Sequence, residues 1–389
     1  MGSRKNGEGS YSIITIKGVQ YQRYRFTDGK QIYAKTAKEL KAKKEKYEQE
    51  LKEGNIVAST DLTLSEVMML WLKNKKNSLE PTSYDNYERI ITKHFTKGKL
   101  GNYQIRSITP QQITNFLSDM AAKYAQGTIT LIKYEIKSTM KYALSQNLIS
   151  GFDISKIEMP KKRDYKVPKR KIRIVTPDDV EKLYNEAMAK NMYGHYIHPT
   201  ACQMLVLIMY SGLRVGEVIA LQWDDIEKDF SAIHVNRTGE RILYRDEKGE
   251  LPNGKKKTHM VSKRPKTDNS YRTIPLPQRA KDLLKDLDES TVHASDGLVF
   301  TYKGHMVCYN SISNALKMLI KKAKCDYPDY TIHGLRHTYG SLLIHKGVDI
   351  KIVSELLGHS DVAFTYNVYI GVLKEDKIKA VEVLNDFLT

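Results

Sequence analysis

Four short motifs in the second half of the chain place the strongest constraint on what it can fold into and do. They read SGLRVGE (211–217), PKTDNSYRTIPL (265–276), HGLRHTYG (333–340) and LGHSDVAFTYNVY (357–369). The residues of interest in them are Arg214, Lys266, His333, Arg336, His359 and Tyr369. Together they form a complete set for attacking a phosphodiester without a metal ion, because they offer a nucleophile, charge stabilisation and a proton.

The residue types in this set suit the steps of phosphodiester cleavage. Guanidinium is planar, always charged and bidentate, so Arg214 and Arg336 suit the two non-bridging oxygens of the phosphate. A tyrosine phenol forms an ester with a moderately good leaving group, so the broken strand can be rejoined without a high-energy cofactor. The chain has 25 tyrosines, and we keep Tyr366 and Tyr339 as alternatives to Tyr369.

At these residues the last half of the chain, roughly 175–389, resembles the tyrosine recombinases, also called the phage-integrase family. The family pattern LGH…T…Y selects Tyr369 as the nucleophile through Thr365. The family often follows this tyrosine with Thr-His, whereas Ile370 and Gly371 follow it here. That departure concerns how the tail leaves the site and not the choice of nucleophile.

The resemblance also implies roles for the other residues of the set. It makes His333 a general base or a phosphate ligand, His359 a hydrogen-bond donor to the phosphate, and Lys266 the acid that protonates the leaving 5′ oxygen. Lys263 is the alternative to Lys266, because strand register can slip in a prediction from sequence. For His337, near the same helix face as His333, we favour a structural hydrogen bond.

Arg214 could simply form a surface ion pair with Glu217, one turn further along the chain. However, it follows an apolar helix, Met204–Tyr210, and a Ser-Gly break. This placement favours an interior position, where an unpaired arginine would be costly. We therefore expect Glu217 to orient Arg214 and not to react itself.

The formal net charge of +18, with a pI near 9.4, favours a polyanionic partner, because each phosphate neutralised releases condensed counterions. A solubilising surface charge is the alternative, but the basic residues cluster, which favours nucleic acid. Cys202, Cys308 and Cys325 have no paired spacing and predict a reducing compartment. Without a secretory signal or a long apolar run, we expect a cytoplasmic protein, bacterial or phage-encoded and associated with the nucleoid.

Other chemistries fit the sequence poorly. It has no Walker loop and no dinucleotide-binding glycine pattern, so we expect no nucleotide cofactor. No clustered Asp/Glu set indicates two-metal cleavage, and no G-x-S-x-G nucleophile elbow is present. We therefore expect neither a cofactor nor a metal site.

The N-terminal region predicts three short strands, Ser10–Lys17, Val19–Phe26 and Gln31–Ala34, with an Asp-Gly turn before the last. A lysine-rich helix over about 37–52 follows, opened by a capping box. This sheet and helix resemble the arm-binding domain of integrases from conjugative transposons, which implies a sheet in the major groove. The basic residues expected to contact DNA there are Arg23, Arg25, Lys30 and Lys35.

Residues 62–150 predict four helices. The first begins at the capping box of Thr63 and Glu66, the second at Thr82, and the third at Thr109-Pro110. The fourth, over 128–146, has an apolar stripe that we expect to be core. A four-helix unit ahead of a catalytic domain resembles the core-binding domain of the family, which forms half of a clamp around DNA.

The segment Lys156–Arg173 is strongly basic and has no periodicity, which is typical of a solvated linker. Between two domains that grip DNA, we favour a linker that crosses the DNA backbone. Residues 238–264 predict a hairpin insertion that touches DNA or a partner subunit. The tail Leu373–Leu388 packs either on its own domain or on a neighbouring subunit. The basic residues of the linker expected to contact DNA are Lys161, Lys162, Arg163, Lys169, Arg170 and Lys171.

These features predict a multidomain, mainly α fold with small β-sheets. We expect an arm-type DNA-binding domain over 1–55, a helical core-binding domain over 60–155, a basic linker over 156–174, and an α+β catalytic domain with a C-terminal tail over 175–389. The last region begins with a clear helix start, Thr176-Pro177, followed by acidic residues.

The resemblance implies a site-specific recombinase that integrates and excises a mobile element through a 3′-phosphotyrosine and a Holliday junction. It also implies a homotetramer on core and arm sites of double-stranded DNA, with an excision factor and a DNA-bending protein as candidate partners. Two alternatives stay open. One is a type IB topoisomerase that relaxes DNA, and the other is a non-catalytic DNA-binding regulator with the same fold.

Overall fold

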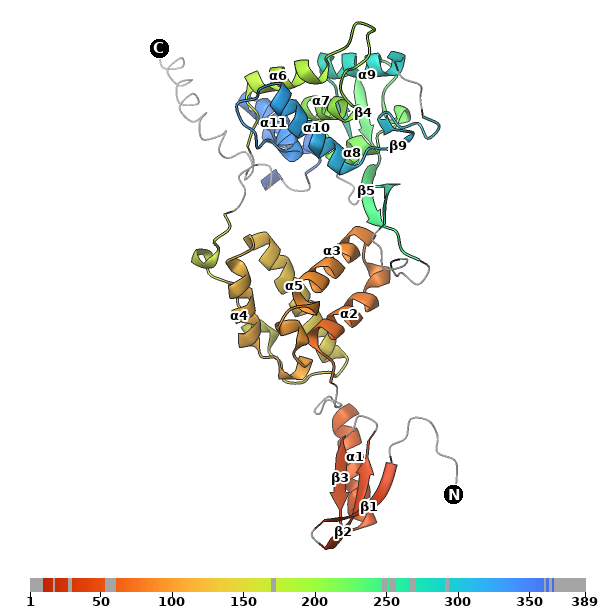
Figure 1. Ribbon diagram of the computed structural model, residues 1–389, viewed down its shortest axis with the longest axis vertical. Coiled ribbons are helices and arrows are strands. Elements are labelled where there is room, and N and C mark those ends of the chain that lie inside the picture. Colours follow the sequence, from red (N-terminus) through yellow and green to blue (C-terminus); the bar gives the residue numbers. More distant parts are fainter. Residues whose placement is uncertain are drawn as a thin grey trace. The chain divides into compact units, whose positions relative to one another are not determined.

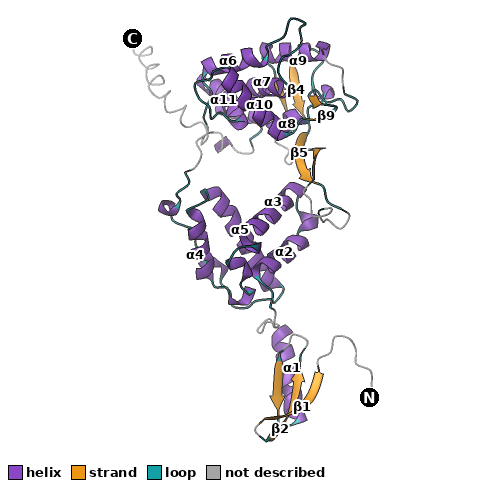
Figure 2. Ribbon diagram, in the orientation of Figure 1, coloured by secondary structure: helices purple, strands orange, loops and turns teal. Residues whose placement is uncertain are grey.

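The computed structural model describes residues 10–16, 18–26, 30–52, 61–168, 173–246, 251, 257–265, 270–290, 294–359, 362–363 and 366. The chain forms two compact units, Met1–Arg170 and Lys171–Thr389 (Figure 1). Helices make up most of both units, and the strands form one N-terminal sheet and several short pairs (Figure 2). In the described part of the chain, no helix has the length and apolar character needed to span a membrane.

The first unit opens with an antiparallel sheet in the order β1-β2-β3, backed by one helix. Its elements are β1 (Ser10–Ile16), β2 (Val19–Arg25), β3 (Gln31–Ala34) and α1 (Ala37–Lys52). Gly18 has a φ of +76°, which allows the tight turn between β1 and β2. The sheet and helix predicted from the sequence are confirmed. Their small core consists of Tyr24, Phe26, Ala34, Leu40 and Tyr47.

Four helices follow in this unit: α2 (Leu64–Asn74), α3 (Pro81–Ile91), α4 (Pro110–Ala121) and α5 (Gln126–Ser145). The capping box predicted at Thr63 is present, and Thr109 makes a second one with Gln112. Helix α3 begins at Pro81 without a side-chain cap, one residue before the predicted start. Short turns join the helices: η1 (Lys76–Ser78), η2 (Thr92–Thr96), η3 (Leu100–Asn102) and η4 (Ile105–Ser107).

The predicted apolar stripe of α5 forms the centre of this helical core. Ile129, Ile132, Ile136 and Met140 are fully buried, whereas Leu144 is only partly buried at the core's margin. The helix therefore turns the expected face inward, as a period of 3.6 residues requires.

The basic segment after α5 is packed over its first half. It contains two short turns, η5 (Ile154–Lys156) and η6 (Lys162–Asp164). Ile157 is 2% exposed, and Tyr165 packs against the helical core. The apolar residues between the lysines anchor this half, a contribution that a count of charges does not reveal.

The second unit is built around α7 (Ala201–Ser211), which is apolar on all sides and almost wholly buried. Helices α6, α8, α9, α10 and α11 all contact it. The other helices are α6 (Pro177–Ala187), α8 (Val215–Ile219), η7 (Trp223–Asp225), α9 (Gln278–Ser290), α10 (Tyr309–Lys322), α11 (Ile332–His345) and α12 (Ile350–Leu357). The predicted start of α6 is confirmed, since the Thr176 side chain accepts from the backbone N–H of Asp179.

Short antiparallel strand pairs flank these helices. They are β4 (Ala232–Val235) with β7 (Arg272–Pro275), β5 (Thr238–Leu243) with β6 (Thr258–Lys263), and β8 (Thr301–Tyr302) with β9 (His305–Met306). The pair β5–β6 confirms the predicted hairpin, although 247–250 and 252–256 lie outside the described residues. A Cβ at Gly239 would lie 2.5 Å from the Ile219 side chain, so glycine lets β5 pack closely on α8.

Candidate active site

The site begins where α7 ends. Gly212 ends the helix with a φ of +66°, in the left-handed region that glycine adopts most readily. A Cβ at this position would lie 2.4 Å from a ring carbon of Tyr339. The chain then turns into α8, whose N-cap residue is Arg214. The Ser-Gly break in the sequence thus delivers Arg214 to the end of a buried helix.

Arg214 is held by a buried carboxylate. Its backbone N–H donates to Glu217 Oε2 at 2.7 Å, and its Nη1 donates to Glu217 Oε1 at 2.9 Å. Its Nη2 donates to the carbonyl of Gly358. The side chain of Arg214 is 39% exposed and that of Glu217 is 5% exposed. Arg214 is thus more accessible than the interior position expected, which leaves its guanidinium open to a ligand from solvent.

Arg336 lies on α11 and is 2% exposed. Its Nη1 donates to the carbonyl of Gly212 at 2.5 Å, and its Nη2 donates to the carbonyl of Leu357. Arg214 and Arg336 are 122 positions apart in the sequence. They nevertheless lie close together, because Arg214 donates to Gly358 at the end of α12, and Arg336 donates to Gly212 at the end of α7 and to Leu357 in α12. Carbonyls at the helix ends thus accept hydrogen bonds from the buried Arg336.

The histidines of the set face the same two arginines. His333 lies on the first turn of α11 with part of its surface open to solvent, and desolvation of its ring, followed by the charges of Arg336 and Arg214, lowers its pKa. His359 follows Gly358, which ends α12 with a φ of +62° as predicted. Burial, followed by the charges of Arg336 and Arg214, lowers the pKa of His359 to about 3. Both imidazoles are therefore neutral at neutral pH, able to accept a proton and to donate one N–H.

His337 takes a structural position. It is 1% exposed, and its ring lies edge-on to that of His333 with 4.3 Å between the ring centres. Burial, followed by the charges of His333 and Arg336, lowers its pKa to about 4. A neutral His337 can therefore pack against the ring of His333.

Arg272 is a member of this site that the sequence did not reveal. Its Nη1 and Nη2 donate to the two oxygens of Glu217 at 2.9 and 2.8 Å. Burial alone would raise the pKa of Glu217, but the hydrogen bonds and charge of Arg272, with the charges of Arg214 and Arg336, hold that pKa below its usual value. A signal was available, because strand alternation puts Arg272 on the same side of β7 as buried Ile274.

Two residues of the expected set, Lys266 and Tyr369, lie outside the described residues, as do Lys169, Arg170 and Lys171. Lys263, the alternative to Lys266, donates to Glu240 at 3.3 Å. Tyr366, the alternative to Tyr369, is 49% exposed. The structure thus brings together Arg214, His333, Arg336 and His359 from the set of six.

Most of the described basic residues expected to contact DNA are exposed, and all of them belong to the first unit. Arg25, Lys30 and Lys35 are exposed in and after the N-terminal sheet, whereas Arg23 is partly buried and donates to Ser12 at 2.8 Å. The others are the exposed Lys161, Lys162 and Arg163 around η6.

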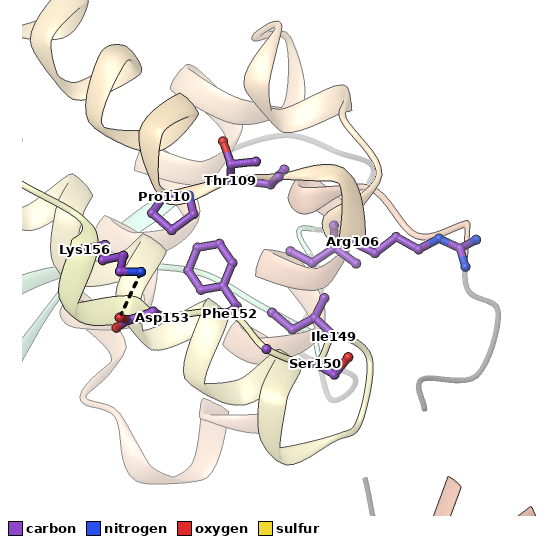
Figure 3. Close-up of a pocket in the computed structure, with 11 residues that line it drawn as sticks. Arg106, Thr109, Pro110, Ile149, Ser150, Phe152, Asp153 and Lys156 are labelled. Atoms are coloured by element: carbon purple, nitrogen blue, oxygen red, sulfur yellow. Dashed lines mark ion pairs between the residues drawn. The ribbon is translucent and has the colours of Figure 1, made fainter. Parts of the chain in front are cut away.

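Two further features, a cluster of acidic residues and a hollow, involve other described residues. Asp178, Asp179 and Asp326 lie close enough to share a cation, but the Lys182 ammonium already contacts all three at 2.7, 3.2 and 3.1 Å. In the first unit, a hollow of about 590 Å³ is lined by Phe152 and Ile149 with charged groups at its rim, and its Lys156 pairs with Asp153 at 3.8 Å (Figure 3).

Comparison with known proteins agrees with this geometry. Residues 173–376 match the Phage integrase family, and residues 63–121 match its N-terminal SAM-like domain. The chain is 30% identical to the "Tyrosine recombinase XerC-like" protein of Caldanaerobacter subterraneus, over 98% of this chain and 97% of the relative. It is 24% identical to the "ICEBs1 integrase" of Bacillus subtilis, over 91% of each chain.

Solved structures show the same fold. The Tn1549 transposon integrase in complex with transposon right end DNA has a TM-score of 0.63 at 18% identity, over 80% of this chain and 98% of that chain. A lambda integrase tetramer bound to a Holliday junction has a TM-score of 0.55 at 15% identity, over 90% and 95%. With half of its length matched by the family and a near full-length relative at 30% identity, the chain belongs to the phage integrase family of tyrosine-type site-specific DNA recombinases.

Proposed function

We propose that the protein cuts and rejoins DNA through Tyr369 to integrate and excise a mobile element. The Tyr369 phenol oxygen forms a bond to the scissile phosphorus while the bond from phosphorus to the 5′ oxygen breaks. The phenol proton passes to His333, and Lys266 protonates the leaving 5′ oxygen. The 5′ hydroxyl so formed attacks the phosphotyrosine of a partner strand, and a Holliday junction connects the two exchanges.

One observation carries this proposal: two arginines and two neutral histidines converge where α7, α11 and α12 meet. Arg214 and Arg336 suit the two non-bridging oxygens, whose charge grows as phosphorus becomes pentavalent. The lowered pKa of His333 leaves it unprotonated at neutral pH, as a base must be. His359 donates a hydrogen bond to the phosphate. Because His359 is neutral, the guanidiniums carry the positive charge of the site.

The proposed partner is double-stranded DNA with core and arm sites. The arm contacts come from Arg23, Arg25, Lys30 and Lys35 on and beside the N-terminal sheet, because exposed basic residues on a β-ribbon suit the major groove. The basic segment 161–171 supplies further contacts to the backbone. Recombination pairs two sites with two subunits each, so we propose a homotetramer on DNA, with an excision factor and a DNA-bending protein setting direction.

The domain limits follow the same proposal. An arm-type domain over 1–55, a core-binding domain over 60–155 and a catalytic domain over 175–389 would separate site recognition from chemistry. The hairpin β5–β6 and the tail Leu373–Leu388 serve contacts with DNA or a neighbouring subunit. Such a protein works at the chromosome, which places it in the cytoplasm of a bacterium.

The two alternatives kept open by the sequence are not favoured. A type IB topoisomerase would share the chemistry but relax DNA as a monomer, whereas the two relatives named above are a tyrosine recombinase and an integrase. A non-catalytic regulator would have no need of guanidiniums and histidines gathered at one point.

A nicked substrate separates these functions. Cleavage beside the nick releases a short fragment that diffuses away, so a cutting enzyme is trapped on the DNA. We expect a covalent complex with this substrate, and recombination between two cognate sites on supercoiled plasmids. Relaxation without recombination would favour the topoisomerase, and DNA binding without any covalent complex would favour the regulator.

A further inference from the structure

Arg272 is a buried arginine beside the proposed phosphate site that cannot itself reach a substrate. It lies at the start of β7, opposite Val235 of β4, and its side chain is 7% exposed. Arg214, at 39%, is far more accessible. A buried guanidinium is costly unless every donor has a partner, so the partners of Arg272 indicate what it does.

Those partners belong to two elements of the site. Nη1 and Nη2 of Arg272 fork the carboxylate of Glu217, and Nε donates to the carbonyl of Leu356 at 2.7 Å. Nη1 also donates to the carbonyl of Ser270 at 3.2 Å. A single side chain therefore joins β7 to the start of α8 and to the end of α12.

The end of α12 shows the consequence most clearly. Three consecutive carbonyls there are each bound by a different arginine: Leu356 by Arg272, Leu357 by Arg336 and Gly358 by Arg214. These carbonyls have no partner within the helix and form its negative end, so guanidiniums suit them. His359 follows directly, and the chain continues from it toward Tyr369.

Arg272 also affects the site through Glu217. Its Oε1 accepts from Arg214 Nη1 and Arg272 Nη1, and its Oε2 accepts from the Arg214 backbone and Arg272 Nη2. With Arg272 present, Arg214 contacts the carboxylate through one terminal nitrogen only. Without Arg272, both oxygens of Glu217 would turn to Arg214, which already donates to them, and draw it away from a phosphate.

We propose that Arg272 is a positioning residue for DNA cleavage, which acts through Glu217 and the Leu356 carbonyl without touching DNA. It sets the direction of the Arg214 guanidinium and the position of His359 at the end of α12. This inference deepens the proposed function of the same site and rests on it.

The test compares Arg272→Met with the wild type on the nicked substrate, under single-turnover conditions and over a range of protein concentrations. We expect the limiting rate of covalent-complex formation to fall on the order of 100-fold, as small misplacements of reacting groups do. The concentration for half-maximal rate should change by less than about threefold, because Arg272 makes no contact with DNA. A matched control is Arg237→Met, which removes an arginine that forks the buried Asp225 and should cleave at close to the wild-type rate.

Two more variants separate positioning from a structural role. In Arg272→Met, burial would raise the pKa of Glu217, so the remaining rate should gain an added dependence on pH over the acid range, beyond the one that His333 gives the wild type. The double variant Arg272→Met/Glu217→Gln should lose this pH dependence and regain about tenfold in rate. Arg272→Lys keeps the charge without the fork, so it should fold, bind DNA normally and cleave slowly.

Two outcomes would overturn the inference. One is an undiminished limiting rate in both Arg272→Met and Arg272→Lys. The other is a fall in DNA affinity and thermal midpoint that matches the fall in rate and is unaffected by Glu217→Gln, because Arg272 would then only hold the fold. A wild type that forms no covalent complex would instead reject the proposed function, which keeps the two failures distinct.

Discussion

Nη1 of Arg336 donates a hydrogen bond of 2.5 Å to the carbonyl of Gly212, 124 residues earlier in the chain. This bond ties the buried arginine of α11 to the residue that ends α7. Gly212 also precedes the turn that delivers Arg214. The place of one arginine of the site thus depends on the backbone that positions the other.

Gly212→Ala should therefore destabilise the protein and disable the site. The substitution meets a left-handed φ and puts a Cβ 2.4 Å from the ring of Tyr339, so the unfolding free energy should fall by about 2–4 kcal/mol. Gly194→Ala is the matched control, because Gly194 has a φ of +79° and nothing within 4 Å. Gly194→Ala should lower the unfolding free energy, measured by urea denaturation, by only about 1 kcal/mol, because it adds backbone strain alone. Equal losses in the two variants would argue against the close packing at Gly212.

Arg214→Lys should bind DNA but cut it poorly. Lysine keeps the charge, yet it cannot contact Glu217, the Gly358 carbonyl and a phosphate oxygen at once. The rate of covalent-complex formation should fall about 100- to 1000-fold, with little change in non-covalent DNA affinity. Gel-shift and single-turnover measurements on one preparation would check this, and retention of the wild-type rate would exclude Arg214 from phosphate binding.

Stability should fall on mild acidification because of His337. Its folded pKa of about 4 lies below the unfolded value of about 6.5, so the unfolded chain binds more protons between these values. Stability is therefore full above the unfolded pKa and decreases as the pH falls below it, by roughly 2 kcal/mol from pH 7 to pH 5 for this residue. In urea denaturation, the unfolding free energy of His337→Gln should depend less on pH than that of the wild type. If His337→Gln kept the full wild-type pH dependence, His337 would not be its cause. The exposed His195→Gln serves as a control.

Glu135→Met should stabilise the first unit. Glu135 is fully buried on α5, both of its oxygens lack a hydrogen-bond partner among the described residues, and burial raises its pKa to about 9. Since the folded pKa exceeds the unfolded one, stability declines as the pH rises toward 9, and keeping the carboxyl neutral at pH 7 costs about 3–4 kcal/mol. Glu135→Met should recover that amount, and Glu135→Gln should remove the pH dependence alone. A destabilising Glu135→Met would reveal a role for this carboxyl.

Local signals predicted much of the fold. Capping boxes, proline starts and helical stripes placed α2, α4, α5 and α6 within a few residues, because these patterns act over neighbouring positions. The motifs and the family resemblance that they carry also placed Arg214, Arg336, His333 and His359 in one site, and three of the four lie at helix ends.

Interactions between distant segments were the part that the sequence did not reveal. Glu135 belongs to a residue type that is rarely buried, yet its neighbours on other helices bury it fully. The partners of Arg272, Glu217 and Leu356, come from elements 55 and 84 residues away, so the residues around Arg272 in the sequence do not reveal them. Tertiary packing decides such positions, and local propensity carries little information about it.

The most direct measurement of the central claim is to identify the residue that carries DNA after cleavage. Wild-type protein is trapped on a nicked substrate, digested with protease and nuclease, and the modified peptide is sequenced by mass spectrometry. We predict a nucleotide 3′-phosphate on Tyr369, and no covalent complex with Tyr369→Phe. Finding the nucleotide on Tyr366 or Tyr339, or recovering no modified peptide from protein that recombines DNA, would contradict the account.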